Sequence, residues 1–338
     1  MKKIFIRENY IDHAKGIGII LVIIAHIISE ANLSSLNILH KTIYSFHMPL
    51  FFFISGFCIS LKPNKNFSLC NKIKKITTNL ILPYIIWSTI YAFLAETILQ
   101  KKTILSILTT RGIAPLWFLG SLAICEIIFY TIKKIHIFTK NKKETFNFIS
   151  ICVLSLLISF LLNTNIVIEY INTKHYFFQF MYITIGRFFF SFAFLIIGYL
   201  FGKLNIITKM RKYTLIIISI LLMITTFYLT YKNNLTINLH LFEISKYTIF
   251  IITSLLGSIS ILFFSKFINN KTLNYIGQNS LGLMILHYIP FPTMSYSIKL
   301  SSLFTSNEII ICIVSTIICI IISITANYII KENLLLKK

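Results

Sequence analysis

Two ionisable side chains, Lys15 and His26, lie eleven residues apart in the first apolar segment of the chain. On a helix, this spacing places them within about 20° of each other around the axis and about 16 Å apart along it. Asp12 falls within about 40° of the same stripe. An imidazole titrates near neutral pH and is suited to general base catalysis, while a lysine binds anionic groups. The stripe is either a site with these two chemistries at its ends, or a snorkelling lysine and a packing histidine.

Further ionisable side chains lie within apolar runs, where each costs a few kcal/mol near the bilayer centre. They are His47, Glu96, Glu126, Arg187 and His287. We expect Arg187 near the outer face, where it binds an acceptor phosphate or carboxylate, or pairs with Glu96 or lipid. Glu126 either pairs with a lysine on the cytoplasmic side or takes part in catalysis. For His47 the two interpretations are helix packing and a part in substrate binding or chemistry. For His287 they are core hydrogen bonding and substrate binding in the lining of a tunnel.

The elements that must position these residues are membrane spans. The chain has 338 residues, is 56% hydrophobic and only 12% charged, and its mean hydropathy is +0.81. Apolar runs near the ~20 residues that cross a bilayer recur throughout. They cover residues 14–30, 43–61, 79–99, 114–132, 147–163, 178–202, 213–231, 246–265, 276–297 and 307–330. The sequence therefore predicts an all-α polytopic membrane protein with about ten transmembrane helices.

The net charge is +22, and the positions of the basic residues follow the predicted membrane topology. Clusters of Lys and Arg follow every second predicted span, as at 62–75, 133–143 and 203–212. This is the positive-inside pattern, and it places both termini in the cytoplasm. No nucleic-acid-binding motif accompanies the charge, so we expect anionic membrane lipid and not nucleic acid as its partner.

The polar connections between spans are too short for a soluble domain, so we expect a single membrane-embedded domain over residues 1–338 without a soluble appendage. The six cysteines include no CxxC pair. We therefore expect neither a disulfide framework nor a metal site.

Two motifs near the N-terminus resemble the acyltransferase-3 family, which comprises bacterial membrane O-acyltransferases with about ten spans. The first is IDHAKG at 11–16 leading to His26, and the second is FHMPLFFFISGF at 46–57. Later stretches are similar in order and spacing: LPY at 82–84 with Trp87, LWFL at 116–119, and IGQNSL at 276–281 leading to His287. The resemblance covers essentially the whole chain.

The family pattern has a basic residue, usually arginine, eleven positions before a histidine. Lys15 and His26 occupy these positions. A second family feature, two arginines separated by two residues, falls on Lys72 and Lys75. Lysine keeps the charge at all three sites but lacks the planar fork of a guanidinium.

The resemblance implies acyl transfer, usually of acetyl, from cytoplasmic acetyl-CoA or another acyl-CoA to a hydroxyl of an extracytoplasmic or lipid-linked glycan. The protein would lie in the bacterial cytoplasmic membrane, with acyl-CoA as a substrate and no bound cofactor. Lys15, Lys72 and Lys75 would dock the CoA phosphates. His26 would act as general base or carry the acyl group. The alternatives are a transporter or flippase of lipid-linked saccharides and a structural or sensory membrane protein, although no inverted repeat is evident.

Overall fold

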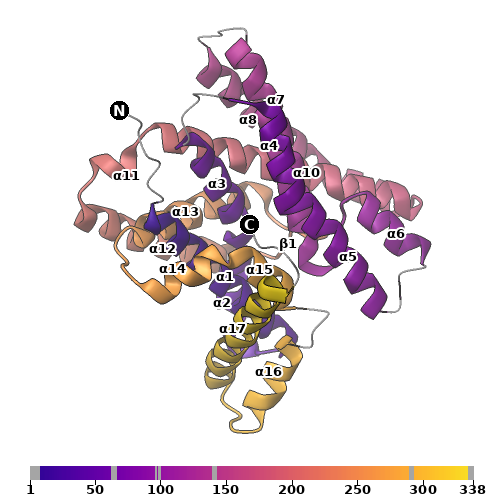
Figure 1. The fold of residues 1–338 in the computed structure, drawn as a ribbon, viewed down its shortest axis with the longest axis vertical. Coiled ribbons are helices and arrows are strands. Elements are labelled where there is room, and N and C mark those ends of the chain that lie inside the picture. The colour runs from indigo at the N-terminus through magenta and orange to yellow at the C-terminus, as the bar shows by residue number, and fades with distance from the viewer. Residues whose placement is uncertain are drawn as a thin grey trace. The chain divides into compact units, whose positions relative to one another are not determined.

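The computed structural model describes residues 8–61, 67–95, 97, 100–138, 143–288 and 293–333. These residues form helices almost throughout, with one hairpin of two short strands, β1 (Ile237–Asn238) and β2 (Glu243–Ile244) (Figure 1). The prediction of an all-α fold is confirmed. Eight helical segments among the described residues are long and apolar enough to cross a membrane.

The chain divides into two compact units. Unit one comprises Met1–Phe51, Ile207–Ile237 and Thr248–Lys338. Unit two comprises Phe52–Ile206 and Asn238–Tyr247, so α3 (His47–Ser60) begins in the first unit and continues in the second. The expectation of one membrane domain over 1–338 is not tested by this division and stays a prediction.

Unit one consists mainly of eight helices from both ends of the chain and a short middle segment. They are α1 (Asn9–Glu30), α2 (Asn37–Tyr44), α12 (Lys212–Asn233), α13 (Tyr247–Ser265), α14 (Lys271–Gln278), α15 (Ser280–Leu286), α16 (Thr293–Ser302) and α17 (Glu308–Asn333). Short helical turns, η1 (Ser34–Leu36) and α11 (Ile206–Lys209), complete the list. The last two helices, α16 and α17, pack side by side (Figure 1).

Unit two holds the central part of the chain. Its further helices are α4 (Leu69–Ile76), α5 (Leu82–Leu94), α6 (Lys101–Leu108), α7 (Trp117–Phe138), α8 (Glu144–Leu162), α9 (Asn165–Asn172) and α10 (Tyr176–Lys203). A π-helical turn, η2 (Thr77–Ile81), joins α4 to α5, and a 3₁₀ turn, η3 (Ala114–Leu116), precedes α7.

Two predicted spans differ from the eight apolar segments. The predicted span 114–132 is α7, which is 22 residues long but carries Glu126, Lys133 and Lys134. The predicted span 276–297 is interrupted at Asn279, between α14 and α15, and α15 ends at Leu286. The sequence beyond contains Pro290 and Pro292, which lack the N–H that a continuing helix needs.

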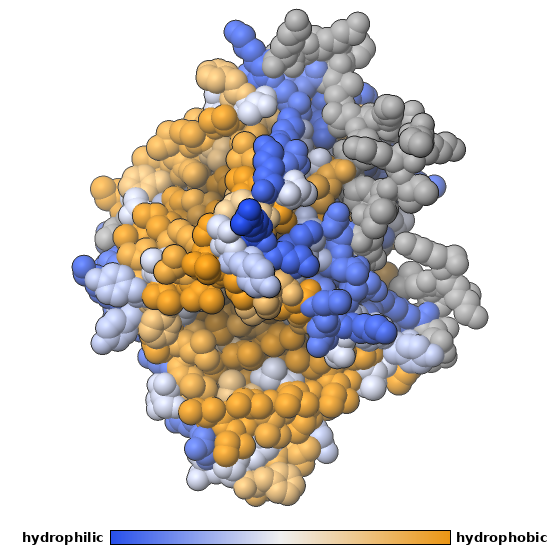
Figure 2. Space-filling view, turned by 90° about the vertical axis from the view of Figure 1, so that its left-hand side faces the viewer, coloured by the Kyte–Doolittle hydropathy of each residue, from blue (hydrophilic) through white to orange (hydrophobic). Residues whose placement is uncertain are grey.

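Apolar side chains cover much of the outside, as a lipid-facing protein requires. In Figure 2, hydrophobic side chains cover much of the visible face, and hydrophilic side chains gather beside them. The long helices α8, α12 and α17 contribute strongly to the exposed apolar surface, because no more than 28% of the apolar stretch of each helix is buried. Exposed members include Leu157, Leu161, Ile220, Ile224, Ile313 and Ile317. The multi-pass membrane assignment is thus supported by surface as well as by length.

Glycines allow close helix contacts within each unit. In unit one, Gly16 of α1 faces the backbone of Leu273, and Gly277 of α14 lies against the backbone carbonyl of Asp12. In unit two, Gly56 of α3 packs against the backbone of α10, and Gly198 of α10 packs against the backbone of α3. Such contacts are typical of membrane helices, where small residues let backbones approach.

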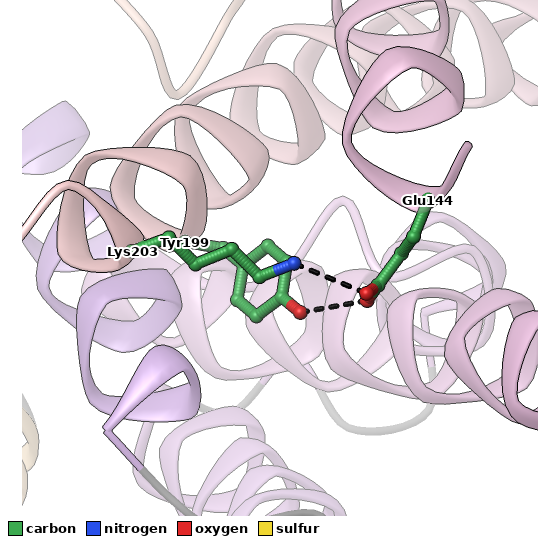
Figure 3. A network of polar contacts seen from close by, with 3 residues as sticks. All are labelled: Glu144, Tyr199 and Lys203. Carbon is green, nitrogen blue, oxygen red and sulfur yellow. Dashed lines mark hydrogen bonds and ion pairs between the residues drawn. The ribbon is translucent and has the colours of Figure 1, made fainter. Parts of the chain in front are cut away.

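A polar network joins α8 to α10 in unit two (Figure 3). The Glu144 carboxylate accepts a hydrogen bond from the Tyr199 hydroxyl at 2.8 Å and forms an ion pair with Lys203 at 3.1 Å. Glu144 is the first residue of α8, where the helix dipole also favours a negative charge. These contacts fix the end of α10 that the topology prediction places in the cytoplasm.

Candidate functional site

The imidazoles of His26 and His287 meet in unit one. His26 is a half-buried residue of α1, and His287 is fully buried at the end of α15. The Nε2 atom of His287 lies 3.3 Å from the Nδ1 atom of His26. The sequence predicts a role for each histidine separately, and the structure brings the two rings together.

A backbone carbonyl determines the tautomers of this pair. The Nδ1 atom of His287 lies 2.8 Å from the carbonyl oxygen of Leu283, which can only accept a hydrogen bond. In the neutral ring, Nδ1 therefore carries the proton and Nε2 accepts. His26 must then donate from Nδ1, which leaves the lone pair of the His26 ring on Nε2. A base oriented by a second group in this way is the arrangement used in acyl-transfer enzymes.

Aromatic side chains surround the two histidines. The ring of Tyr288 lies 5.3 Å from that of His26, and the ring of Tyr44 lies 6.3 Å from it. Tyr44 also contacts the rings of His47 at 4.9 Å and His40 at 4.2 Å. We call this group the histidine–tyrosine cluster: His26, His40, Tyr44, His47, His287 and Tyr288.

His47 is fixed in the same manner as His287. It is buried, and its Nδ1 atom lies 2.9 Å from the carbonyl oxygen of Ile43, four residues earlier. The structure therefore places His47 in the cluster but one ring away from His26, with Tyr44 in between. A role in substrate binding stays a prediction for His47 and His287.

The α1 helix presents Lys15 and His26 on its inner side. Both are half-buried, and the residues between them on the same stripe, Ile19 and Val22, are buried. The half-exposed apolar residues of α1 lie on the opposite side of the helix: Ile17, Ile20, Leu21 and Ile24. The polar ends of the stripe thus face protein in unit one and not the lipid-facing side of α1.

Helix α14 packs closely against α1. Gly16 of α1 and Gly277 of α14 lie at this contact, so the small residues of α1 accommodate a neighbouring helix. Asn279, at the junction of α14 and α15, accepts hydrogen bonds from Asn327 at 3.1 Å and Lys331 at 2.6 Å. Asn279 therefore anchors the segment that carries His287.

Lys72 and Lys75 belong to unit two, on α4. The Lys72 ammonium lies 5.3 Å from the centre of the Tyr130 ring, and Lys75 is exposed. Lys15 belongs to unit one, so the joint docking of CoA phosphates by the three lysines stays a prediction.

Glu126 and Arg187 also lie in unit two. Glu126 accepts a hydrogen bond from Ser55 of the second motif at 2.6 Å. Arg187 is fully buried and binds backbone carbonyls, while its expected partner Glu96 lies outside the described residues. In the part of the chain that the structure describes, no group of three or more His, Cys, Asp or Glu side chains is arranged to hold a metal ion.

Tyr44, Tyr288 and His40 are members of the cluster that the sequence does not single out. Tyr44 precedes His47 by three residues and Tyr288 follows His287 directly. Their proximity to the two histidine positions was the available signal. Tyrosines near the ends of predicted spans are usually interfacial anchors. The sequence therefore does not distinguish Tyr44 and Tyr288 from ordinary anchors.

Comparisons with known proteins agree with the first two motifs. Residues 8–326 match the family model of the acyltransferase domain, Acyl_transf_3. Nodulation protein NolL of Mesorhizobium japonicum (strain LMG 29417 / CECT 9101 / MAFF 303099) is 32% identical over 158 residues, which are 44% of this chain and 39% of that protein. No solved structure matches the chain. The chain therefore belongs to the acyltransferase-3 family, and its long apolar helices point to a multi-pass membrane protein.

Proposed function

We propose that this acyltransferase is an O-acetyltransferase of the bacterial cytoplasmic membrane. It moves an acetyl group from cytoplasmic acetyl-CoA to a hydroxyl of an extracytoplasmic or lipid-linked glycan. The observation that supports this proposal is the His26–His287 pair, in which a backbone carbonyl leaves the basic nitrogen of His26 on the side away from His287.

In the proposed reaction, Nε2 of His26 accepts the proton of the acceptor hydroxyl as its oxygen attacks the thioester carbonyl. The new C–O bond forms, the C–S bond breaks, and the proton passes from His26 to the departing CoA thiolate. Transfer through an acyl-imidazole uses the same lone pair in two steps. His287 stabilises the positive charge that develops on His26, because the Nε2 atom of His287 accepts a hydrogen bond from the Nδ1–H group of His26.

The donor is bound at the inner end of the stripe in this proposal. Lys15 contacts the CoA phosphates, and Lys72 and Lys75 add positive charge at the cytoplasmic side. The pantetheine arm then extends along α1 from Lys15 toward His26, over about 16 Å.

The test measures acetyl transfer in membranes that contain the full chain. Membranes are incubated with labelled acetyl-CoA and surface glycan from the same cells. We expect label in the saccharide with the wild type and a loss of about 100-fold or more with His26→Gln, since general base catalysis contributes about 10²–10⁴-fold.

His175→Gln is the matched control, because His175 is an exposed histidine at the start of α10. It should retain activity, and both variants should keep the thermal unfolding midpoint of the wild type. Normal acetylation by a folded His26→Gln variant would overturn the role of His26. Movement of lipid-linked sugar without any label transfer would support a transporter instead.

A further inference from the structure

A second polar site is built around Arg187 in unit two. The Nη1 atom of Arg187 donates to the carbonyl oxygens of Arg111 at 3.1 Å and His240 at 3.3 Å, and Nη2 donates to that of Thr110 at 3.1 Å. The guanidinium also lies over the Trp117 ring at 4.8 Å. Arg187 therefore ties two loops, one around residue 110 and one around residue 240, to α10.

The loop around residue 110 needs this support. Thr110 has φ +56° and Gly112 has φ +77°, both in the left-handed region. For a β-branched residue such as threonine, this conformation costs about 1–3 kcal/mol. Because Arg187 binds the Thr110 carbonyl, the strain is held at one defined geometry, as is common at binding sites.

The site carries the positive charge of two arginines. Arg187 is completely buried, and the Arg111 guanidinium, 4.6 Å from the Phe180 ring centre, is the second cation of the loop pair. Among the described residues, no carboxylate lies within ion-pair distance of either arginine. A buried charge without a partner of opposite sign is costly, and backbone carbonyls compensate only in part.

Several polar atoms at the site are unused within the described part of the chain. The buried Nε donors of Arg111 and Arg187, the Thr110 hydroxyl and the Nε2 atom of His240 have no hydrogen-bond partner there. Burial, together with repulsion from Arg187 and Arg111, lowers the pKa of His240 to about 4. The surroundings of His240 thus disfavour a further positive charge and would be stabilised by a negative one.

The predicted topology places these groups on the extracytoplasmic side, where the acceptor resides. Both loops follow odd-numbered predicted spans, and Arg187 lies in the outer half of the predicted span 178–202. We propose that Arg111 binds an oxyanion, the phosphate or carboxylate of the acceptor, and that Arg187 positions the loop that carries Arg111. The assignment of this oxyanion to the acceptor rests on the proposed function, whereas the anion site itself does not.

The test measures anion binding directly, on the purified full chain in detergent. Thermal unfolding is followed with inorganic diphosphate or glucuronate, each compared with chloride at equal ionic strength. We expect a saturable rise in Tm of about 3 °C or more with one of the two anions. In Arg111→Gln the same anion should bind at least about tenfold more weakly.

Arg111→Gln is informative because Arg187 binds the backbone carbonyl of residue 111, which the substitution leaves in place. Arg111→Lys should bind with intermediate strength. Lys102→Gln removes an exposed cation in the same unit and should bind as the wild type does.

The two anions distinguish the sources of the charged group. Stabilisation by diphosphate alone supports the phosphate of a lipid-linked saccharide, and stabilisation by glucuronate alone supports an acidic sugar. Equal effects of all three anions, or equal affinity in the wild type and a folded Arg111→Gln variant, would overturn the site. Since no acyl transfer is measured, failure of the proposed reaction leaves this outcome unaffected.

Discussion

His287 accepts a hydrogen bond from His26 across 3.3 Å, while its own Nδ1 proton is held by the Leu283 carbonyl. His287→Leu removes the acceptor and lets the His26 ring reorient. We expect kcat to fall about 10-fold to 100-fold, a part of the range for general base catalysis, with little change in the KM for acetyl-CoA. His287→Gln offers an amide oxygen to the same proton and should restore much of the rate.

Steady-state kinetics and the pH profile of kcat distinguish orientation from packing. The Leu variant should also shift the acidic limb of that profile, because His26 must be unprotonated to act as a base, and a packing defect alone would not produce this shift. If the Gln and Leu variants lose the same activity while both remain folded, His287 does not position His26.

Lys15 tests donor binding. Lys15→Ala should raise the KM for acetyl-CoA about tenfold, the equivalent of one charge-assisted hydrogen bond, whereas Lys15→Arg should have a mild effect. Lys271→Ala, at an exposed lysine of α14 in the same unit, is the control. An unchanged KM in Lys15→Ala would reject phosphate docking at this end of the stripe.

Gly277 tests the helix contact that positions the site. A methyl group at this position would overlap the backbone carbonyl of Asp12, so Gly277→Ala must push α14 away from α1. We expect a loss of about 1–3 kcal/mol in stability, seen as a lower Tm, together with reduced transfer. In Gly18→Ala the nearest atoms are side chains of Phe51 and Leu50 at 3.0–3.1 Å, which can move, so the loss should be smaller. Equal Tm values for the Gly277 variant and the wild type would contradict the close packing.

His240 predicts a pH dependence of stability. Its pKa is about 4 in the folded protein, below the ordinary value of 6.5, because burial and the cations Arg187 and Arg111 oppose protonation. Its contribution is therefore fully present above pH 6.5 and is lost as the pH falls from 6.5 through 4. The measurement is the Tm of the wild type and of His240→Gln from pH 8 to about pH 4. The Tm difference should shift against the wild type at low pH, and a constant difference would show that His240 does not titrate as the structure indicates.

The sequence by itself determined that this is a membrane protein, and it determined the part of the site that lies on α1, Lys15 and His26. Apolar length identifies spans because the bilayer core is free of water and has a fixed thickness. The alignment of Lys15 with His26 follows from the helical period alone, and the structure places both on the buried side of α1. The interruption of the predicted span 276–297 was not evident, because hydropathy does not record where a helix ends.

Only the tertiary structure decided which polar groups meet. His287 is 261 residues from His26 in the chain, and no local period relates the two. For Arg187, the sequence offered an acceptor anion, Glu96 or lipid as partners, whereas the structure shows carbonyls of two loops bound to it. Every backbone carbonyl is an acceptor in the sequence, but which ones point at a buried guanidinium depends on how distant segments pack.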